Sequence, residues 1–329
     1  MKIVFLDAKT IGEDIDLSDY DKLGQVVKYD FSTPDEIPER VKDAQVLVIN
    51  KAPMNEKTLR QAEKLKLICV TATGTNNLDK AYLEQRGIAW RNVADYSTHS
   101  VAQHTFAMLF YLMEHLRYYD DYVKQDRYTN DRCFTHFEKH FSELTGKTWG
   151  IIGLGNIGRQ VAKAARAFGA RIIYYSASGQ KGQDGYEQVD LDTLLKESDI
   201  LSVHAPLNKY TENLMDRSCF QKMKKESIFL NLGRGQIVVE KDLAEALEQG
   251  EIAAAGLDVL CQEPMSPENP LRGFKDSDRL FITPFIKRHK RNTMQALDRS
   301  LDCLTHIRDG SCSTQELSIK FFLNGGITV

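Results

Sequence analysis

The sequence predicts an α/β protein built from two doubly wound, Rossmann-like domains. Apolar runs of strand length alternate with helical patterns almost throughout the chain, and this alternation indicates parallel strands joined by right-handed crossovers. The pattern restarts at residue 148, so it describes two units in succession. A length of 329 residues also favours two cores over one.

The first unit is predicted from the elements of the first 95 residues. Strand-length apolar runs occupy residues 2–7, 45–50, 65–73 and 88–93. Helical patterns separate them at residues 34–44, 55–64 and 78–87. One long helix is then expected over residues 97–119. Its apolar positions nearly encircle it, and a helix of that kind is usually buried.

The second unit repeats the alternation. Its predicted strands are residues 148–155, 171–176, 199–206, 227–233, 253–259 and 279–284. A last helical pattern, residues 291–310, is expected to return to the first unit. We therefore predict one discontinuous domain of residues 1–97 and 291–329 and a second domain of residues 98–290.

Composition excludes several classes of protein. The net charge of −3 gives no overall positive field, so nucleic acid is not expected as a partner. No apolar run reaches the roughly 18 residues of a membrane span, and residues 1–9 look like a first strand rather than a secretion signal. Six cysteines without CxxC spacing predict reduced thiols in the cytoplasm, with neither a disulfide framework nor a metal site.

A glycine-rich turn is the most informative motif. A predicted strand runs into Gly153-x-Gly155-x-x-Gly158, and a helix with alanines on one side follows. The first glycine allows a tight turn, the second lets the backbone approach a pyrophosphate, and the third lets helix and strand pack closely. The N-terminus of the helix adds N–H groups and the positive end of a dipole. The motif predicts a dinucleotide site; the alternative, a glycine turn without a ligand, is disfavoured by the flanking strand and helix.

The end of the following strand bears on the choice of cofactor. An acid there would bind the adenosine ribose 2′-hydroxyl, but this chain has Ser176 and no acid as far as Lys181. A carboxylate would repel a 2′-phosphate, and Lys181 offers a cation. The sequence therefore favours NADP(H) over NAD(H), the alternative being that small residues tolerate either cofactor.

Two further strand ends carry charged residues. Arg234 stands between glycines after one apolar strand, and Asp258 and Glu263 follow the next. An arginine is rarely buried without an anionic partner, and its planar fork suits a carboxylate. A structural Arg–Glu ion pair is the alternative.

With these residues the chain resembles the D-isomer-specific 2-hydroxyacid dehydrogenases. The likeness covers nearly the whole length, through TATGTNNLD, ADYSTHSVAQHTF, LTGKTWGIIGLGNIG, VHAPL, NLGRGQIV, AGLDVLCQEP and ITP. The resemblance implies NAD(P)H-dependent reduction of a 2-keto acid to a D-2-hydroxy acid. It makes residues 1–97 and 291–329 the substrate-binding domain and residues 98–290 the dinucleotide-binding domain, through which a homodimer forms.

Roles for single residues follow from the same resemblance. Arg234 would grip the carboxylate and carbonyl of the substrate. The backbone of Thr73 and Gly74 would take the carboxylate, with Tyr96 close by. Glu263 would raise the pKa of a histidine acid/base toward working pH.

The resemblance also implies the cofactor contacts. Asp258 would hold the nicotinamide amide. The remaining contacts would be Gly153, Gly155, Asn156, Ile157, Gly158, Ser176, His204, Pro206, Thr211, Leu232 and Gly233.

The match fails at the catalytic histidine. The family places it directly after ITP, where this chain has Phe285 followed by a run of cations. A phenyl ring transfers no proton, so slow reduction is the most that we expect. Glu263 is the first candidate for a substitute acid, ahead of His289 and Tyr96.

Two other functions compete with the enzyme. One is a dinucleotide-binding regulator or pseudoenzyme of the same fold, for which the cations of Lys287–Arg291 would be a binding surface or a solvated face. The other is nucleic-acid binding through that cluster, which the acidic remainder of the chain disfavours.

Overall fold

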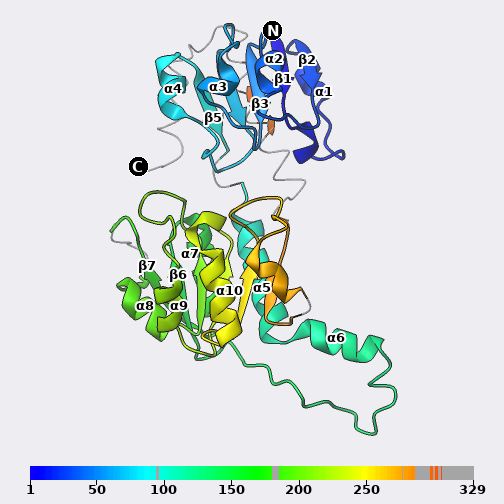
Figure 1. The fold of residues 1–329 in the computed structure, drawn as a ribbon, viewed down its shortest axis with the longest axis vertical. Coiled ribbons are helices and arrows are strands. Elements are labelled where there is room, and N and C mark those ends of the chain that lie inside the picture. The colour runs from blue at the N-terminus through cyan, green and yellow to red at the C-terminus, as the bar shows by residue number, and fades with distance from the viewer. Residues whose placement is uncertain are drawn as a thin grey trace. The chain divides into compact units, whose positions relative to one another are not determined.

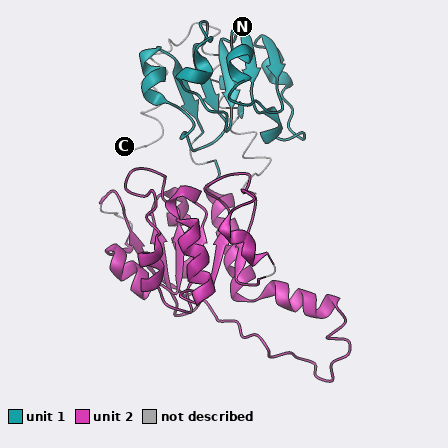
Figure 2. Cartoon of the chain, in the orientation of Figure 1, with its two compact units in different colours: residues 1–97, 288–329 teal, residues 98–287 magenta. Residues whose placement is uncertain are grey.

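The protein, described by a computed structural model, divides into two compact units (Figure 2). Unit 1 comprises residues 1–97 and 288–329, and unit 2 comprises residues 98–287. The structure describes residues 1–93, 96–179, 185–275 and 277–285, together with Leu297, Asp298, Leu301, Asp302 and Thr305.

Unit 1 contains a five-stranded, wholly parallel sheet. Its strands, in spatial order, are β2 (Gln25–Lys28), β1 (Lys2–Phe5), β3 (Val46–Ile49), β4 (Leu67–Val70) and β5 (Ala89–Asn92). The sequences VLVI of β3 and LICV of β4 are buried throughout, because strands in the middle of a parallel sheet are covered on both faces. The edge strand β2 was not predicted, since its ends are exposed and its apolar core is only two residues long.

The helices of unit 1 are short. They are η1 (Ala8–Thr10), α1 (Ser18–Asp21), α2 (Ile37–Arg40), α3 (Glu56–Leu59) and α4 (Lys80–Gln85). The three predicted helices are present as α2, α3 and α4 but shorter than predicted. Asn55 caps α3 by accepting the Thr58 N–H at 3.1 Å, and Gly87, with φ +64°, follows the last turn of α4.

Two hydrophobic clusters form the core of unit 1. One joins α2, α3 and α4 to the sheet, and the other includes Tyr20 of α1 and Leu297. The Tyr20 hydroxyl donates to the Leu297 carbonyl at 3.2 Å. The described residues of the predicted C-terminal helix are helical, and Leu297 packs in unit 1 as expected.

Unit 2 contains a seven-stranded parallel sheet. In spatial order its strands are β12 (Leu280–Ile282), β11 (Ala254–Leu257), β10 (Ile228–Asn231), β9 (Ile200–Val203), β6 (Thr148–Ile152), β7 (Arg171–Tyr175) and β8 (Glu187–Gln188). The strand order reverses between β6 and β9, which is the topological switch point at which such sheets bind ligands. The six predicted strands are all present; β8, with two polar residues, was missed.

Helices cover both faces of this sheet (Figure 1). On one face lie α5 (Thr98–Met113) and α7 (Asn156–Ala167), whose apolar residues form one cluster. On the other lie α8 (Leu191–Glu197), α9 (Arg217–Lys222) and α10 (Glu240–Gln249). Short helices η2 (Gly235–Ile237) and η3 (Pro270–Phe274) follow β10 and β11.

The single helix predicted over residues 97–119 is wrong. Helix α5 ends at Met113, and a separate helix, α6 (Leu116–Lys124), begins after His115. His115 has φ +52°, a left-handed conformation that cannot continue a right-handed helix. The predicted burial of α5 is confirmed, because seven of its side chains are buried.

Within the described residues, none of the helices has both the length and the apolar character that a bilayer span requires.

Candidate active site

The predicted cofactor residues of unit 2 follow the carboxyl ends of β6, β7, β9, β10 and β11. Because these strands are parallel, their carboxyl ends lie along one edge of the sheet, on either side of the switch point. Sequence positions more than a hundred residues apart, such as Gly153 and Asp258, are thus brought to the same edge.

The three glycines of the turn after β6 meet different surroundings. A Cβ on Gly153 would lie 2.7 Å from the Ala205 Cα, and Gly153 has φ +91°. A Cβ on Gly158 would lie 2.3 Å from the Gly153 carbonyl oxygen. Both glycines are therefore required by packing. A Cβ on Gly155 would have no atom within 4 Å, so this glycine faces open space.

Open space at Gly155 coincides with the start of α7. Gly155 is the N-cap of that helix, and it is exposed. The Gly155 and Ile157 N–H groups donate to no residue among those the structure describes. Free N–H groups at a helix N-terminus attract an anion. The turn therefore fits the pyrophosphate of a dinucleotide.

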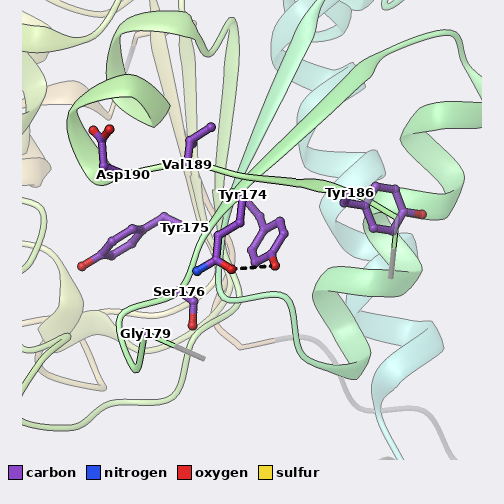
Figure 3. A pocket seen from close by; sticks show the side chains of 8 residues that line it. Tyr174, Tyr175, Ser176, Gly179, Tyr186, Val189 and Asp190 are labelled. Atoms are coloured by element: carbon purple, nitrogen blue, oxygen red, sulfur yellow. Dashed lines mark hydrogen bonds between the residues drawn. The ribbon is translucent and has the colours of Figure 1, made fainter. Parts of the chain in front are cut away.

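A cavity of about 520 Å³ adjoins the end of β7 (Figure 3). Its lining residues are Tyr174, Tyr175, Ser176, Gly179, Tyr186, Gln188, Val189 and Asp190. Ser176 is the one predicted cofactor residue among them, and its Oγ lies 3.2 Å from the Ser178 Oγ. The cavity thus borders the position expected for the adenosine ribose rather than the glycine turn.

Asp190 is the acid that lines this cavity. Its carboxylate accepts the Thr193 N–H at 2.8 Å and the Thr193 hydroxyl at 2.9 Å, capping α8. The Thr193 N–H lowers the pKa of Asp190. The predicted cation, Lys181, lies outside the described residues.

The end of β9 is held by buried polar groups. His204 Nε2 lies 3.1 Å from Ser202 Oγ, which accepts the Trp149 indole N–H at 2.8 Å. Thr211 is buried, and its hydroxyl donates to the Pro206 carbonyl at 2.7 Å. Thr211 therefore closes the loop on which Pro206 is exposed.

Arg234 follows β10 in a loop fixed by its neighbours. The Asn231 side-chain amide donates to the Arg234 carbonyl at 2.9 Å, and the Gly233 N–H donates to the Asn231 side-chain oxygen at 3.1 Å. Leu232 and Gly233 are buried, and Arg234 is partly exposed. The guanidinium donates to the Gly233 carbonyl at 2.8 Å.

The loops after β10 and β11 pack directly together. A Cβ on Gly235 would lie 1.9 Å from the Leu260 carbonyl carbon, so only glycine fits there. Glu263 is exposed on the second loop, and its carboxylate accepts the Leu260 N–H at 3.1 Å. The contact at Gly235 places the loop of Glu263 against the residue that follows Arg234.

Asp258 is fully buried at the end of β11. Its Oδ1 accepts the Thr283 hydroxyl at 2.6 Å, and His104 Nε2 lies 3.4 Å from the same oxygen. His104 Nε2 also lies 3.0 Å from the Thr283 Oγ. His104 comes from α5 and Thr283 follows β12, so three separate elements meet at this carboxylate.

Phe285 follows two residues after Thr283. Its side chain is 37% exposed, and its N–H donates to the Thr283 carbonyl at 2.9 Å. Its φ of +56° is left-handed, a conformation that is unusual for a bulky residue. His289 and the Lys287–Arg291 cluster lie outside the described residues.

The predicted substrate residues of unit 1 lie after β4 and β5. The Thr73 hydroxyl donates to the Val93 carbonyl at 2.9 Å, and the Asn92 amide donates to the Thr73 carbonyl at 2.7 Å. Neither the Thr73 nor the Gly74 N–H donates to any residue that the structure describes. These two N–H groups suit a carboxylate. Tyr96 is partly buried just before α5.

A buried acid supports the neighbouring loop in unit 1. The Asp7 carboxylate, 6% exposed, accepts the N–H groups of Asn50, Lys51 and Ala52 at 2.7–3.0 Å. Burial raises the pKa of Asp7, against the opposing effect of these N–H groups.

Sequence reasoning missed four polar residues: Asp7, His104, Ser202 and Thr283. Each stands alone within or beside an apolar run, and each bonds to a residue far away in the sequence or to a side chain on another strand. Polar singletons in apolar segments are the signal that could have found them, because a buried polar group needs a partner. Among the described residues, no cluster of His, Cys, Asp or Glu is arranged to hold a metal ion.

Comparison with known proteins bears on the whole chain. Residues 106–286 match the model of the "D-isomer specific 2-hydroxyacid dehydrogenase, NAD binding domain". The chain is 35% identical to a glycerate dehydrogenase of Methylorubrum extorquens over 90% of this chain and 92% of that protein. It is 33% identical to a hydroxypyruvate reductase of Blautia hydrogenotrophica over 94% and 98% of the two chains. A D-lactate dehydrogenase from Aquifex aeolicus, solved with NAD and lactic acid, has a similar structure: TM-score 0.82, 26% identity, and 94% and 96% of the chains covered.

Proposed function

The chain belongs to the D-isomer specific 2-hydroxyacid dehydrogenase family and is an NAD(P)-dependent oxidoreductase that reduces 2-keto acids to D-2-hydroxy acids; from this we propose which residues carry the reaction. The observation that carries the proposal is the shared sheet edge in unit 2. The open glycine turn at Gly155 and the arginine Arg234 both lie on it, so this edge supplies a cofactor site and a cation that can bind a carboxylate.

The cofactor is a nicotinamide dinucleotide, which when bound supplies the hydride. We propose that the N–H groups of Gly155 and Ile157 bind its pyrophosphate, and that Asp258 holds the nicotinamide amide. The other proposed contacts are Gly153, Asn156, Gly158, Ser176, His204, Pro206, Thr211, Leu232 and Gly233. NADP(H) is the proposed preference, because Ser176 rather than an acid follows β7 and the acid of the adjoining cavity, Asp190, is engaged with Thr193.

The substrate is a small 2-keto acid. We propose that its carboxylate is bound by Arg234 and by the N–H groups of Thr73 and Gly74, with Tyr96 close by. The Arg234 guanidinium also polarises the keto carbonyl and stabilises the developing alkoxide, because its charge is fixed in place before the reaction. Glycerate dehydrogenase and hydroxypyruvate reductase among the relatives favour a short substrate such as hydroxypyruvate or glyoxylate.

Proton transfer is the step at which we propose that this chain departs from its family. We propose that Phe285 occupies the position of the catalytic histidine, since it directly follows ITP. Glu263 is the proposed substitute acid, because its loop packs on Gly235 next to Arg234. Tyr96 and His289 rank below it. Loss of a general acid slows a reaction by about 10² to 10⁴-fold, so turnover is expected to be slow.

A homodimer formed through unit 2 is proposed as the working state, and the cytoplasm as its location. Exposed phenylalanines support the dimer: Phe134 is 88% exposed, Phe137 70% and Phe141 63%. Three such side chains on one segment are unusual for a surface that meets only water. The location rests on the cysteines, since all four within the described residues are free thiols.

The test of the function is NADPH oxidation with a panel of 2-keto acids, comparing the parent with Arg234→Ala and Arg234→Lys. The parent should reduce at least one acid slowly. Arg234→Ala should abolish reduction and binding of oxamate while NADPH binds as before. Arg234→Lys should recover only part of the binding, because lysine lacks the bidentate fork. Normal oxamate binding by Arg234→Ala would contradict the assignment.

A dinucleotide-binding regulator remains a second candidate, and Phe285 is the observation that favours it. A regulator would bind NADPH and a keto acid together without oxidising the cofactor. Complete inactivity of the parent, with intact binding of both ligands, would select this function.

A further inference from the structure

His104 meets Asp258 because of how α5 lies on the sheet. A Cβ on Gly256 of β11 would lie 3.3 Å from the Met108 Cε methyl carbon, so α5 approaches the strand closely at that point. His104 stands one helical turn before Met108. Asp258 stands two residues after Gly256, so its side chain points to the face of the sheet on which a Gly256 side chain would lie. The register that packs Met108 on Gly256 therefore also places His104 on Asp258.

The three contacts at this point assign the donors. A threonine hydroxyl has a single hydrogen, and Thr283 donates its own to Asp258 Oδ1 at 2.6 Å. Thr283 Oγ must then accept from His104 Nε2, which lies 3.0 Å away. The imidazole therefore carries a proton on Nε2, and the same N–H faces Asp258 Oδ1 at 3.4 Å.

These contacts fix the plane of the Asp258 carboxylate. Asp258 is fully buried, and the His104 side chain is 13% exposed. Hydrogen bonds to a charged group are stronger in such surroundings than in water. With His104 and Thr283 both on Oδ1, rotation of the carboxylate would break two contacts at once. Asp258 is thus held in one orientation by the protein's own side chains.

We infer that His104 is a positioning residue for the nicotinamide half of the cofactor, acting through Thr283 and Asp258. The inference rests on the proposed function, in which Asp258 holds the nicotinamide amide. A carboxylate held in one orientation needs no rotation of its own to accept that amide, and the nicotinamide ring is then presented in one pose. His104 itself touches neither substrate nor cofactor in this role.

The test separates the two halves of the cofactor by binding. NADPH and 2′,5′-ADP, which lacks the nicotinamide, are titrated against the parent, His104→Leu, His104→Gln and Thr283→Val. His104→Leu removes the N–H that bonds Thr283 and faces the charged Asp258. It should weaken NADPH binding about ten-fold, while the affinity for 2′,5′-ADP changes by less than about two-fold. His104→Gln keeps an N–H donor and should recover most of the affinity.

The double variant His104→Leu/Thr283→Val checks that the residues act as one unit. It should lose little more NADPH affinity than either single variant, because coupled contacts are not additive. Melting temperatures are recorded for every variant. If His104→Leu fails to fold, Thr283→Val, which changes only the hydroxyl, decides the result by the same NADPH and 2′,5′-ADP titrations.

Two results would overturn the inference alone. One is parent-like NADPH binding by His104→Leu and Thr283→Val; the other is an equal loss of NADPH and 2′,5′-ADP, which would make His104 a support of the domain as a whole. A parent that binds neither NADPH nor NADH would instead overturn the proposed function, and this inference with it.

Discussion

At the residue scale, substitution of Phe285 tests the proposal that this chain lacks the acid/base histidine of its family. The φ of +56° at Phe285 is a conformation that histidine and asparagine adopt more readily than phenylalanine. Phe285→His therefore suits the backbone that is already there. If this is the position of the lost acid, the variant should reduce its best keto acid about 10² to 10⁴-fold faster than the parent, with NADPH affinity unchanged.

Phe285→Asn is the matched control for this prediction. Asparagine also suits a left-handed backbone but transfers no proton, so its turnover should stay at the level of the parent. Steady-state kinetics with a glyoxylate and hydroxypyruvate panel make the measurement. Equal gains from both variants would mean that relief of backbone strain, rather than an acid, changes the rate.

Ser176 tests the cofactor preference. An aspartate at this position would repel a 2′-phosphate and could bind the ribose 2′-hydroxyl of NADH. Ser176→Asp should therefore weaken the binding of NADPH and leave the binding of NADH unchanged or make it tighter. The neutral Ser176→Asn should change the affinity for either cofactor only slightly. Fluorescence titration of the two reduced cofactors measures this. Tenfold tighter binding of NADH than of NADPH by the parent would already contradict the proposed preference.

At the scale of the element, the turn between β6 and α7 separates packing from ligand binding. Gly158→Ala would put a methyl group 2.3 Å from the Gly153 carbonyl oxygen, so the helix must move. Overpacking of this kind costs about 1–3 kcal/mol. Gly155→Ala meets no atom within 4 Å and needs only an ordinary φ of −77°.

Gly158→Ala should therefore lower the melting temperature. Gly155→Ala should leave the melting temperature unchanged but weaken the binding of NADPH, because the added methyl group crowds the pyrophosphate. Thermal melts and cofactor titrations on both variants check the pair. A Gly155→Ala protein that binds NADPH normally would show that the pyrophosphate does not approach this glycine.

Elements with strong apolar patterns were predictable from the sequence, and short or interrupted ones were not. Strands such as β3 and β10 are continuous apolar runs, so periodicity and length identify them. Strand β2 has only two apolar residues and lies at an edge, and its pairing with β1 is a tertiary fact. The break between α5 and α6 rests on the single left-handed residue His115, which no glycine or proline signals.

Within the candidate site, the strand–turn–helix unit around the glycines was predictable because one motif carries it. Gly153, Gly155 and Gly158 have a spacing whose physics requires a strand before and a helix after. His104, Thr283 and Asp258 do not, because their hydrogen bonds join residues up to 179 positions apart. Such contacts depend on how α5 lies across the sheet, and spacing along the chain does not encode that.

At the scale of the whole molecule, α6 and the segment after it form an arm of unit 2, residues 116–147, that projects away from the sheet (Figure 1). The arm is tied together by its own side chains. Tyr118 donates to Glu138 at 2.6 Å, Tyr122 donates to Asp131 at 2.6 Å, and His136 stacks on Tyr122 with ring centroids 3.9 Å apart. The hydrogen bond to Glu138 raises the pKa of Tyr118 to about 12, so the tyrosine stays a donor well into the alkaline range.

The arm thus holds a defined shape while Phe134, Phe137 and Phe141 remain exposed on it. Covering a phenylalanine side chain stabilises by about 1.5–3 kcal/mol, so a partner surface that received these rings would bind firmly. A second copy of the chain is the partner that every preparation contains. We therefore expect the parent to be a dimer in solution, and Phe137→Glu/Phe141→Glu to be a monomer, because buried carboxylates without partners are costly.

The matched control is Phe31→Glu in unit 1, at a phenylalanine that is 61% exposed but lies off the arm; this variant should remain a dimer. Sedimentation velocity across a concentration series makes the measurement, and a dimer that survives the double substitution would place the interface elsewhere on the molecule.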